Sequence, residues 1–378
     1  MHKSVVSILK CESYDPAGLA ARLEKLLDQL GGMSAFVKPG ERVLIKPNLL
    51  KAASPERAVT THPALVEAVV REVQKAGGVV TIGDSPGIGK IQKIFDETGM
   101  TGVAERTGAR LIELKESVEA KTADGSTFQT LELSKEVLDA DKVINLPKVK
   151  THAQMYVTLG VKNCFGCVVG KRKPQWHFKA GVKREYFAGL ILDIYRTINP
   201  VLTIADGITA MEGNGPGSGK PRDLGLLFAS ADALAMDRVI VDVLGLKALE
   251  VPLFSVAKAR GITGTELSEL ELRGAELAEL KVQGFEPAKT IDMMFGPPFM
   301  RRYFKNAVTA KPDVDHDRCT LCNDCVNVCP TDVMSVKDKK IDIYYRDCIH
   351  CFCCQEVCPE GAITPKQGWL LKLLEGRS

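Results

Sequence analysis

Apolar residues follow two different periods in the first three hundred residues. Short apolar runs bounded by turn residues predict strands at residues 42–46, 79–83, 142–145, 201–205 and 224–229. Apolar positions at a helical period predict helices at residues 63–76 and at about 231–244, the first of them ending at a Gly-Gly pair. Strands that alternate with helices are typical of an α/β domain with a mainly parallel sheet.

Polar residues follow several of these predicted strands. Asp84 follows the strand at 79–83, and Asp206 follows the strand at 201–205. Open α/β sheets bind their ligands beyond the carboxyl ends of their strands, so we expect a site there.

The chain has 378 residues, which is enough for two domains, and its 45% hydrophobic and 26% charged content is that of an ordinary globular protein. No run of eighteen apolar residues occurs, and the first ten residues do not resemble a signal peptide. We therefore expect no membrane span and a cytoplasmic location.

Nine of the twelve cysteines fall between Cys319 and Cys358, and without a sign of export they favour metal binding over disulfides.

The spacing of eight cysteines indicates the kind of metal centre. The run C-x2-C-x2-C-x3-C-P occurs twice, ending at Pro330 and at Pro359. In such runs the first three cysteines ligate one [4Fe-4S] cluster and the fourth ligates the other, whereas zinc sites rarely have a third evenly spaced cysteine. Cys353 is surplus, and we interpret it as a small buried residue. The sequence therefore predicts two [4Fe-4S] clusters, one held by Cys319, Cys322, Cys325 and Cys358 and the other by Cys348, Cys351, Cys354 and Cys329.

This pattern resembles two-cluster bacterial ferredoxins over residues 311–378. We expect a small α+β ferredoxin-like domain there, an α/β domain over residues 1–300, and a linker near residues 296–311. The C-terminal part has nine Lys/Arg and eleven Asp/Glu residues, a net charge of only −2. Free carriers use a strong charge to steer to their partners, so the weak charge favours a module that serves its own chain and takes electrons from an external donor protein.

Residues 146–184 are strongly basic. They contain nine Lys/Arg and no Asp or Glu, in a chain whose formal net charge is +3. Such a charge favours a small anionic ligand, although a solvated basic face is the plainer alternative. Nucleic acid is a poorer candidate, because no nucleic-acid-binding motif accompanies the charge.

A glycine-rich stretch begins at Glu212 and reads Glu-Gly-Asn-Gly-Pro-Gly-Ser-Gly-Lys-Pro. Gly213, Gly215 and the following glycines would let backbone N–H groups turn toward an anion. The stretch does not fit a nucleotide phosphate loop, and a flexible surface turn is an equal alternative.

Several further segments together resemble the domain-of-unknown-function family 362, over about residues 5–285. They include Leu-Ile-Lys-Pro-Asn at 44–48, Gly-Asp-Ser-Pro-Gly at 83–87, Asn-Leu-Pro-Lys-Val-Lys-Thr-His at 145–152 and Gly-Val-Lys-Asn at 160–163. The resemblance implies a fusion to a ferredoxin module but no settled reaction. It also implies that the site is lined by Lys46, Asn48, His62, Asp84, Lys148, Lys150, His152, Lys162, Asn163, His177, Asp206 and Glu212.

We expect a reductase from these features, with His152 or His177 supplying protons and Asp84 or Asp206 orienting them. The candidate site residues also have plainer, structural interpretations. Asp84 and Asp206 can hold turns, and His62 can cap the helix that follows it. Two other functions stay open. One is an electron carrier that docks to an acidic partner through the +5 charge of residues 1–310. The other is a cluster-assembly factor that uses Cys164 and Cys167, which are otherwise two packed apolar residues.

Overall fold

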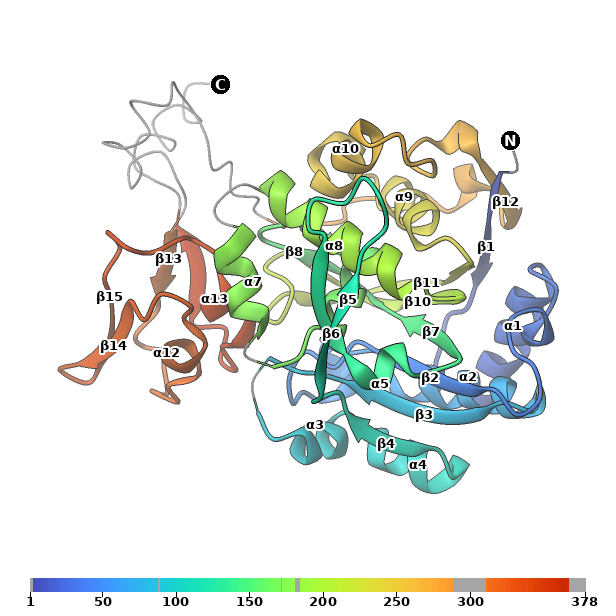
Figure 1. The fold of residues 1–378 in the computed structure, drawn as a ribbon, viewed down its shortest axis with the longest axis horizontal. Helices are drawn as coiled ribbons and strands as arrows, with labels where there is room; N and C mark the ends of the chain where they lie inside the picture. The colour runs from blue at the N-terminus through green and yellow to red at the C-terminus, as the bar shows by residue number, and fades with distance from the viewer. Residues whose placement is uncertain (1–2, 88, 171, 181–183, 289–310, 367–378) are drawn as a thin grey trace.

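The structure is a computed structural model that describes residues 3–87, 89–170, 172–180, 184–288 and 311–366. It has two parts (Figure 1). The α/β domain comprises the described residues up to 288, and the cluster module comprises residues 311–366. Except for residue 311, the expected linker at 296–311 lies outside the described residues.

One mixed sheet of ten strands forms the centre of the α/β domain. Its main path runs β12-β1-β11-β10-β7-β2-β3-β4, and β8 and β9 branch from β10. Six of its strand pairs are parallel, whereas β1–β11, β10–β11 and β8–β9 are antiparallel. The mainly parallel sheet predicted from the sequence is therefore confirmed. The strands are β1 (Ser4–Lys10), β2 (Arg42–Pro47), β3 (Val79–Asp84), β4 (Arg110–Glu113), β7 (Lys142–Leu146), β8 (Lys148–His152), β9 (Tyr156–Thr158), β10 (Leu202–Glu212), β11 (Lys220–Ser230) and β12 (Leu270–Gly274).

Helices cover both faces of this sheet (Figure 1). Successive side chains of a strand point to opposite faces, so Leu227 of β11 packs in the core beneath α1 and α2, and Phe228 packs in the core beneath α8, α9 and α10. A two-stranded hairpin, β5 (Ser117–Lys121) and β6 (Thr130–Ser134), stands apart from the sheet. The helices are α1 (Pro16–Asp28), α2 (Pro63–Lys75), α3 (Ile91–Glu97), α4 (Met100–Thr107), α5 (Lys135–Leu138), α6 (Gly160–Asn163), α7 (Arg172–Ala180), α8 (Arg184–Ile198), α9 (Ala233–Val243) and α10 (Pro252–Ala259).

The predicted strands at 42–46, 79–83 and 142–145 correspond closely to β2, β3 and β7. The predicted helix at 63–76 is α2, and its N-cap is His62, whose Nδ1 accepts a hydrogen bond from the backbone N–H of Ala64. The strand expected to end at residue 205 is longer: β10 continues to Glu212. Asp206 therefore lies within a strand, and the prediction that it follows a strand end was wrong.

The cluster module has two antiparallel hairpins and two short helices. β13 (Lys311–Val314) pairs with β16 (Ile363–Lys366), and β14 (Met334–Lys337) pairs with β15 (Lys340–Ile343). α12 (Asp324–Val328) and α13 (Cys353–Val357) pack against each other. Each helix lies within one of the two cysteine runs, so the doubled motif corresponds to a doubled local structure.

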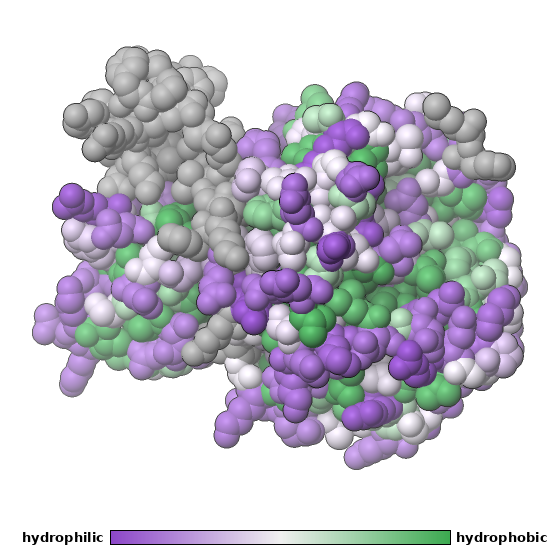
Figure 2. Space-filling view, viewed as in Figure 1, coloured by the Kyte–Doolittle hydropathy of each residue, from purple (hydrophilic) through white to green (hydrophobic). Residues whose placement is uncertain are grey.

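On the face shown in Figure 2, hydrophilic side chains cover most of both parts, and hydrophobic ones gather in a band across the middle of the α/β domain, near β7. Among the helices of the described residues, none has the length and apolar character that crossing a membrane requires.

Candidate functional site

The eight motif cysteines line two separate cavities in the cluster module. The first cysteine cavity is lined by Cys319, Cys322, Cys325 and Cys358, and the second by Cys329, Cys348, Cys351 and Cys354. Each cavity thus takes three cysteines from one run and the fourth from the other, which is the grouping expected for two cubane clusters.

Backbone geometry in the two cysteine runs is also repeated. Leu321 and Asn323 in the first run, and His350 and Phe352 in the second, all have positive φ angles between 55° and 67°. Left-handed residues between cysteines turn backbone N–H groups inward and form the concave anion sites that iron–sulfur clusters occupy in other proteins. The N–H of Ala362 already donates to Sγ of Cys358, at 3.2 Å. These residues therefore fit a [4Fe-4S] cluster in each cavity.

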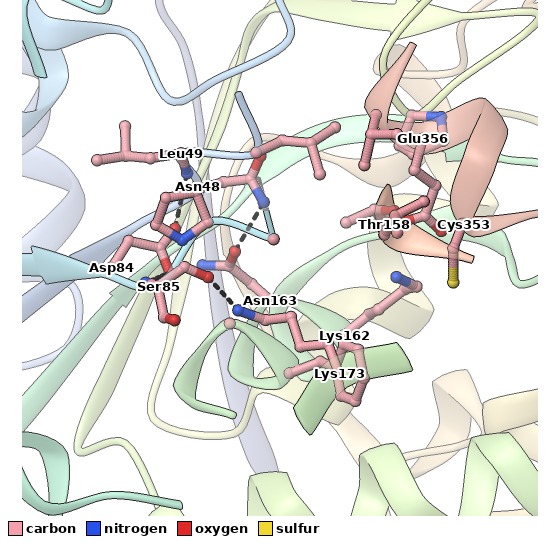
Figure 3. A pocket seen from close by; sticks show the side chains of 18 of the residues that line it. Asn48, Leu49, Asp84, Ser85, Thr158, Lys162, Asn163, Lys173, Cys353 and Glu356 are labelled. Carbon is pink, nitrogen blue, oxygen red and sulfur yellow. Dashed lines mark hydrogen bonds between the residues drawn. The ribbon is translucent and has the colours of Figure 1, made fainter. Parts of the chain in front are cut away.

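A third cavity lies between the two parts of the chain (Figure 3). This interdomain cavity has a volume of about 100 Å³. Its wall on the side of the α/β domain includes Lys46, Lys150, Lys162 and Lys173, and the cluster module contributes Val328, Cys353, Glu356 and Val357. Seven residues predicted for the site line it, namely Lys46, Asn48, Asp84, Lys150, Lys162, Asn163 and His177.

Lys46 and Asp84 form a buried ion pair at the ends of β2 and β3. Their Nζ and Oδ1 atoms lie 2.9 Å apart, and both side chains are at most 5% exposed. The second carboxylate oxygen of Asp84 accepts the backbone N–H of Leu49, at 2.8 Å. Gly166 closes over this pair, and a Cβ at that position would lie 2.5 Å from Nζ of Lys46. Asp84 is therefore held in place by the side chain of Lys46 and the backbone of Leu49.

The other three lysines differ in their partners. Nζ of Lys150 donates to Oδ1 of Asn48 and to the carbonyl of Val59, each at 2.8 Å, and Nζ of Lys173 donates to the carbonyl of Ser85. Lys162 has no hydrogen bond or ion pair to any described residue, and the ring of Phe165 lies 5.9 Å from its Nζ.

Burial lowers the pKa of each of these three lysines, to about 8 for Lys173, because the charged form loses its hydration. Neutral oxygens are the hydrogen-bond acceptors of Lys150 and Lys173. An anion in the cavity would add to the single negative charge of Glu356 that these lysines share.

His152 meets the cluster module at the edge of this cavity. Its Nε2 lies 2.9 Å from Oε1 of Glu356. Its Nδ1 accepts the backbone N–H groups of Gln154 and Met155, at 3.1 and 3.2 Å, and these hydrogen bonds assign the ring proton to Nε2. Burial, together with the charge of Lys162, lowers the pKa of His152 to about 4. The ring is therefore neutral, and its Nε2 lies close to Glu356 although the geometry of this contact is not that of a hydrogen bond.

Glu356 is ionised in this setting. Burial acts to raise the pKa of its carboxyl group, but the contact with His152 and the charge of Lys162 outweigh burial and hold the pKa well below its usual range. Its side chain is 16% exposed. Glu356 thus places a negative charge from the cluster module among basic residues of the α/β domain.

His177 lies on α7 and is also neutral, because burial lowers its pKa to about 3. Its ring packs between Phe165 and Phe187, with centroid distances of 5.4 and 4.1 Å. Its Nδ1 is buried and has no hydrogen-bond partner among the described residues. A buried polar atom without a partner, in the wall of a cavity, is a point at which a ligand or a water can bind.

Lys148 and Asp206 do not line the cavity. Oδ2 of Asp206 lies 2.9 Å from Nζ of Lys148 and accepts the backbone N–H of His62, also at 2.9 Å. Oδ1 of Asp206 accepts the hydroxyl of Tyr14, at 2.6 Å, and the Tyr14 ring stacks on His62 at 3.6 Å. These four residues form a separate buried cluster whose polar atoms bind one another.

The glycine-rich loop joins β10 to β11 and contacts the cluster module. The N–H groups of Gly213 and Gly215 donate to the carbonyls of Glu286 and Gly213, at 2.9 Å each, so neither is directed at an anion as the sequence suggested. Oδ1 of Asn214 accepts from Gln355, at 2.6 Å. Glu212 accepts the backbone N–H of Glu286, at 3.0 Å. Only Pro216 of this loop lines the interdomain cavity, and the main contact of the loop is with the cluster module.

Cys164 and Cys167 are buried. Burial raises the pKa of Cys167 to about 12 and the pKa of Cys164 well above its usual value. Thiolates are the reactive and metal-binding form of cysteine, so these two residues fit the interpretation as packed side chains.

Sequence reasoning missed Glu356, Lys51 and Lys173 as site residues, and it assigned Cys353 to packing alone. Glu356 lies between two predicted cluster ligands, Cys354 and Cys358. This position in the sequence was the one local signal that Glu356 belongs to a functional site. Nζ of Lys51 donates to the carbonyl of Cys358 across the domain boundary, at 2.7 Å.

The chain belongs to the family described as a domain of unknown function, DUF362, whose model matches residues 43–242. A 4Fe-4S dicluster domain matches residues 311–359, so the chain combines this family with a ferredoxin-type domain and is an iron–sulfur protein. The resemblances found in the sequence to both families are confirmed.

A relative is the thylakoid-associated protein sll1697 of Synechocystis sp., which is 45% identical over 260 residues, covering 69% of this chain and 80% of that protein. The cytoplasmic location expected for this chain stays a prediction.

Two solved structures are similar at a low level. The lactate racemase apoprotein from Thermoanaerobacterium thermosaccharolyticum aligns with a TM-score of 0.39 and 13% identity, covering 61% of this chain and 55% of that one. A Thermotoga maritima protein solved in a structural-genomics programme aligns with a TM-score of 0.38 and 11% identity, covering 71% of this chain and 62% of that one. The chain thus spans little more than half the length of these two proteins, and neither likeness bears on its function.

Proposed function

We propose that the protein is a reductase that passes electrons from an external donor protein to a small anionic molecule in the interdomain cavity. Two [4Fe-4S] clusters, held by the cysteines of the two cysteine cavities, would supply one-electron transfer at low potential. One observation carries the proposal. The same cavity is lined by lysines of the α/β domain on one side and by residues next to cluster ligands on the other.

The charge of the cavity supports an anionic ligand. Four lysines and two carboxylates line it, and one of those carboxylates, Asp84, is already paired with Lys46. Lys150, Lys162 and Lys173 then face Glu356 alone. In a cavity shielded from water these ammonium groups would attract a carboxylate or a phosphate strongly. The volume of about 100 Å³ restricts the ligand to a small molecule.

The histidines support ligand binding beside the cavity. His177 is neutral, and its buried Nδ1 lacks a partner among the described residues, so it can hydrogen-bond to the ligand. His152 carries its proton on Nε2, near the carboxylate of Glu356. A neutral ring can orient the ligand, and the two protons that a two-electron reduction of a double bond takes up would come from water.

The proposal is tested with the full chain purified without oxygen. Analysis of iron and acid-labile sulfide is expected to give about eight of each per chain, which is the number that two such clusters require. The reduced protein is then mixed with candidate small anions while its EPR signal is followed. We expect one class of anion to reoxidise the protein, and Lys162→Met to slow this reoxidation by at least about tenfold.

A control variant, Lys340→Met, removes an exposed lysine of the cluster module and is expected to behave as the wild type. If no small anion reoxidises the protein, whereas a partner redox protein does, the chain is an electron carrier and the proposal fails.

A further inference from the structure

The two cysteine cavities are not equivalent with respect to the interdomain cavity. Cys353 lines both the second cysteine cavity and the interdomain cavity. Among the described residues, none lines both the first cysteine cavity and the interdomain cavity. A single side chain therefore separates the second cysteine cavity from the proposed ligand.

Cys353 is well placed to form the wall between the second cysteine cavity and the interdomain cavity. It lies between Cys351 and Cys354, which both line the second cysteine cavity, and it is only 5% exposed. Figure 3 shows its sulfur beside the interdomain cavity, on the same side as the amine of Lys162. The rate of electron transfer falls steeply with distance, so a cluster behind this wall is the better partner for a molecule in the cavity.

The first cysteine cavity includes an exposed cysteine, Cys322, beside the partly buried Cys319 and two buried ones. The cysteines of the second cavity are buried (Cys348, Cys354) or partly buried (Cys329, Cys351). A protein that docks on the module can therefore approach the first cavity most closely at Cys322.

Each cavity is also approached by a different lysine of the α/β domain. Nζ of Lys51 donates to the carbonyl of Cys358, at 2.7 Å, and Cys358 lines the first cavity. Lys162 shares the interdomain wall with Cys353 of the second cavity. A positive charge near a cluster stabilises its reduced form, which carries one more negative charge, and so raises its reduction potential.

We propose that electrons enter at the face around Cys322, pass from the first cysteine cavity to the second, and reach the interdomain cavity across Cys353. An external one-electron carrier is oxidised by one electron at each step. A reducible anion in the interdomain cavity gains two electrons in turn and two protons from water, and no bond of the protein is made or broken. The assignment of an anion as the electron acceptor rests on the proposed function. The difference between the two cysteine cavities rests on the geometry of this chain alone.

The experiment is an EPR-monitored redox titration of the full chain, comparing the wild type with Lys162→Met, Lys51→Met and Lys340→Met. We expect two midpoint potentials. Lys162→Met lowers one of them, Lys51→Met lowers the other, and Lys340→Met changes neither. Cys351→Ser, which offers an oxygen ligand in the second cavity, is expected to alter the EPR signal of the centre that responds to Lys162.

Two added probes give the order of the centres. Inorganic phosphate, as a small anion for the interdomain cavity, is expected to lower the potential that responds to Lys162. A water-soluble Cr(III) complex is expected to shorten the spin relaxation of the Lys51-sensitive centre more strongly, because Cys322 is exposed. Iron content and visible absorbance show whether each variant has kept its clusters.

The inference is overturned if Lys162→Met and Lys51→Met shift the same potential, or if phosphate acts on the Lys51-sensitive centre. If the two lysines act on separate centres and phosphate follows Lys162, the inference holds even when no anion is ever reduced. In that case only the proposed reductase function is rejected, and the inferred electron path stands.

Discussion

Nε2 of His152 lies 2.9 Å from Oε1 of Glu356, so a strand of the α/β domain and a helix of the cluster module meet through one polar contact. β8 supplies the histidine, and α13 supplies the glutamate. Two hydrogen bonds join the same two parts: Lys51 donates to the carbonyl of Cys358, and Asn214 accepts from Gln355. The interdomain cavity is a product of this docking, because neither part encloses it alone.

Glu356→Ala is expected to loosen the docking, because it leaves the basic residues around His152 without their buried negative partner. Hydrogen–deuterium exchange measures the effect. We expect amides of residues 213–219 and 353–358 to exchange on the order of tenfold faster, as the loss of about 1.4 kcal/mol of docking free energy implies. Glu279→Gln removes an exposed carboxylate and serves as the control. Unchanged exchange in the Glu356 variant would mean that the contact does not hold the module in place.

Lys46→Met is expected to lower the free energy of unfolding by about 3–5 kcal/mol, because it leaves the buried carboxylate of Asp84 without its cation. The double variant Lys46→Met/Asp84→Asn is expected to recover part of that loss, since the unpaired charge is then gone. Denaturant unfolding of the wild type, both single variants and the double variant completes a double-mutant cycle. Additive losses would show that the two side chains are not coupled.

Gly166→Ala is expected to destabilise the protein by about 1–3 kcal/mol, because the new methyl group would overlap the Lys46–Asp84 pair. Gly87 offers a matched control, since it lines the same cavity and a Cβ there would have no atom within 4 Å. Thermal unfolding compares the two alanine variants. Equal melting temperatures for both would contradict the close approach at Gly166.

Stability is expected to fall in mild acid because of His152 and His177. Burial lowers their pKa values to about 4 and about 3, whereas an unfolded histidine titrates near 6.5. As the pH falls from 6.5 toward 4, the unfolded chain therefore binds protons that the folded chain refuses. Each histidine then removes up to about 1.4 kcal/mol of stability per pH unit.

His177→Phe keeps a ring between Phe165 and Phe187 and removes one of these titrating groups. Its unfolding free energy, measured in urea at several pH values by circular dichroism, is expected to decline less steeply below pH 6.5 than that of the wild type. His316→Phe, at an exposed position, is the control and is expected to keep the wild-type slope. A slope for His177→Phe that equals the wild-type slope would contradict the assignment of His177 as a buried neutral ring.

Much of the sheet could be predicted from the sequence, because β2, β3 and β7 are short apolar runs whose ends are marked by polar or turn residues. β10 could not be predicted in full. Asp206 interrupts its apolar pattern, but Lys148 and Tyr14 satisfy the carboxylate inside the sheet, so the strand continues. A local sequence pattern cannot predict that a charged side chain will be paired by tertiary contacts.

The lysines and asparagines of the site could be found because they lie in motifs of one family. Their division into a cavity and a separate cluster around Asp206 could not, because it depends on long-range contacts such as those of Lys150 with Asn48 and of Lys148 with Asp206. Glu356 and Cys353 become part of the site only when the module docks on the α/β domain, and no local pattern encodes that docking. The glycine-rich loop shows the converse: its composition suggested an anion site, whereas its backbone groups are already used within the protein.

The central claim is that the interdomain cavity receives electrons from the cluster module and delivers them to an anion. The most direct measurement is the rate at which the reduced protein is reoxidised by a small anion that it accepts, in the wild type and in Lys162→Met. The account predicts rapid reoxidation of the wild type and of Lys340→Met, and a loss of at least about tenfold in Lys162→Met, as the removal of one buried charge contact implies. Equal rates in all three proteins would contradict it, because the electrons would then leave by a route that does not pass through this cavity.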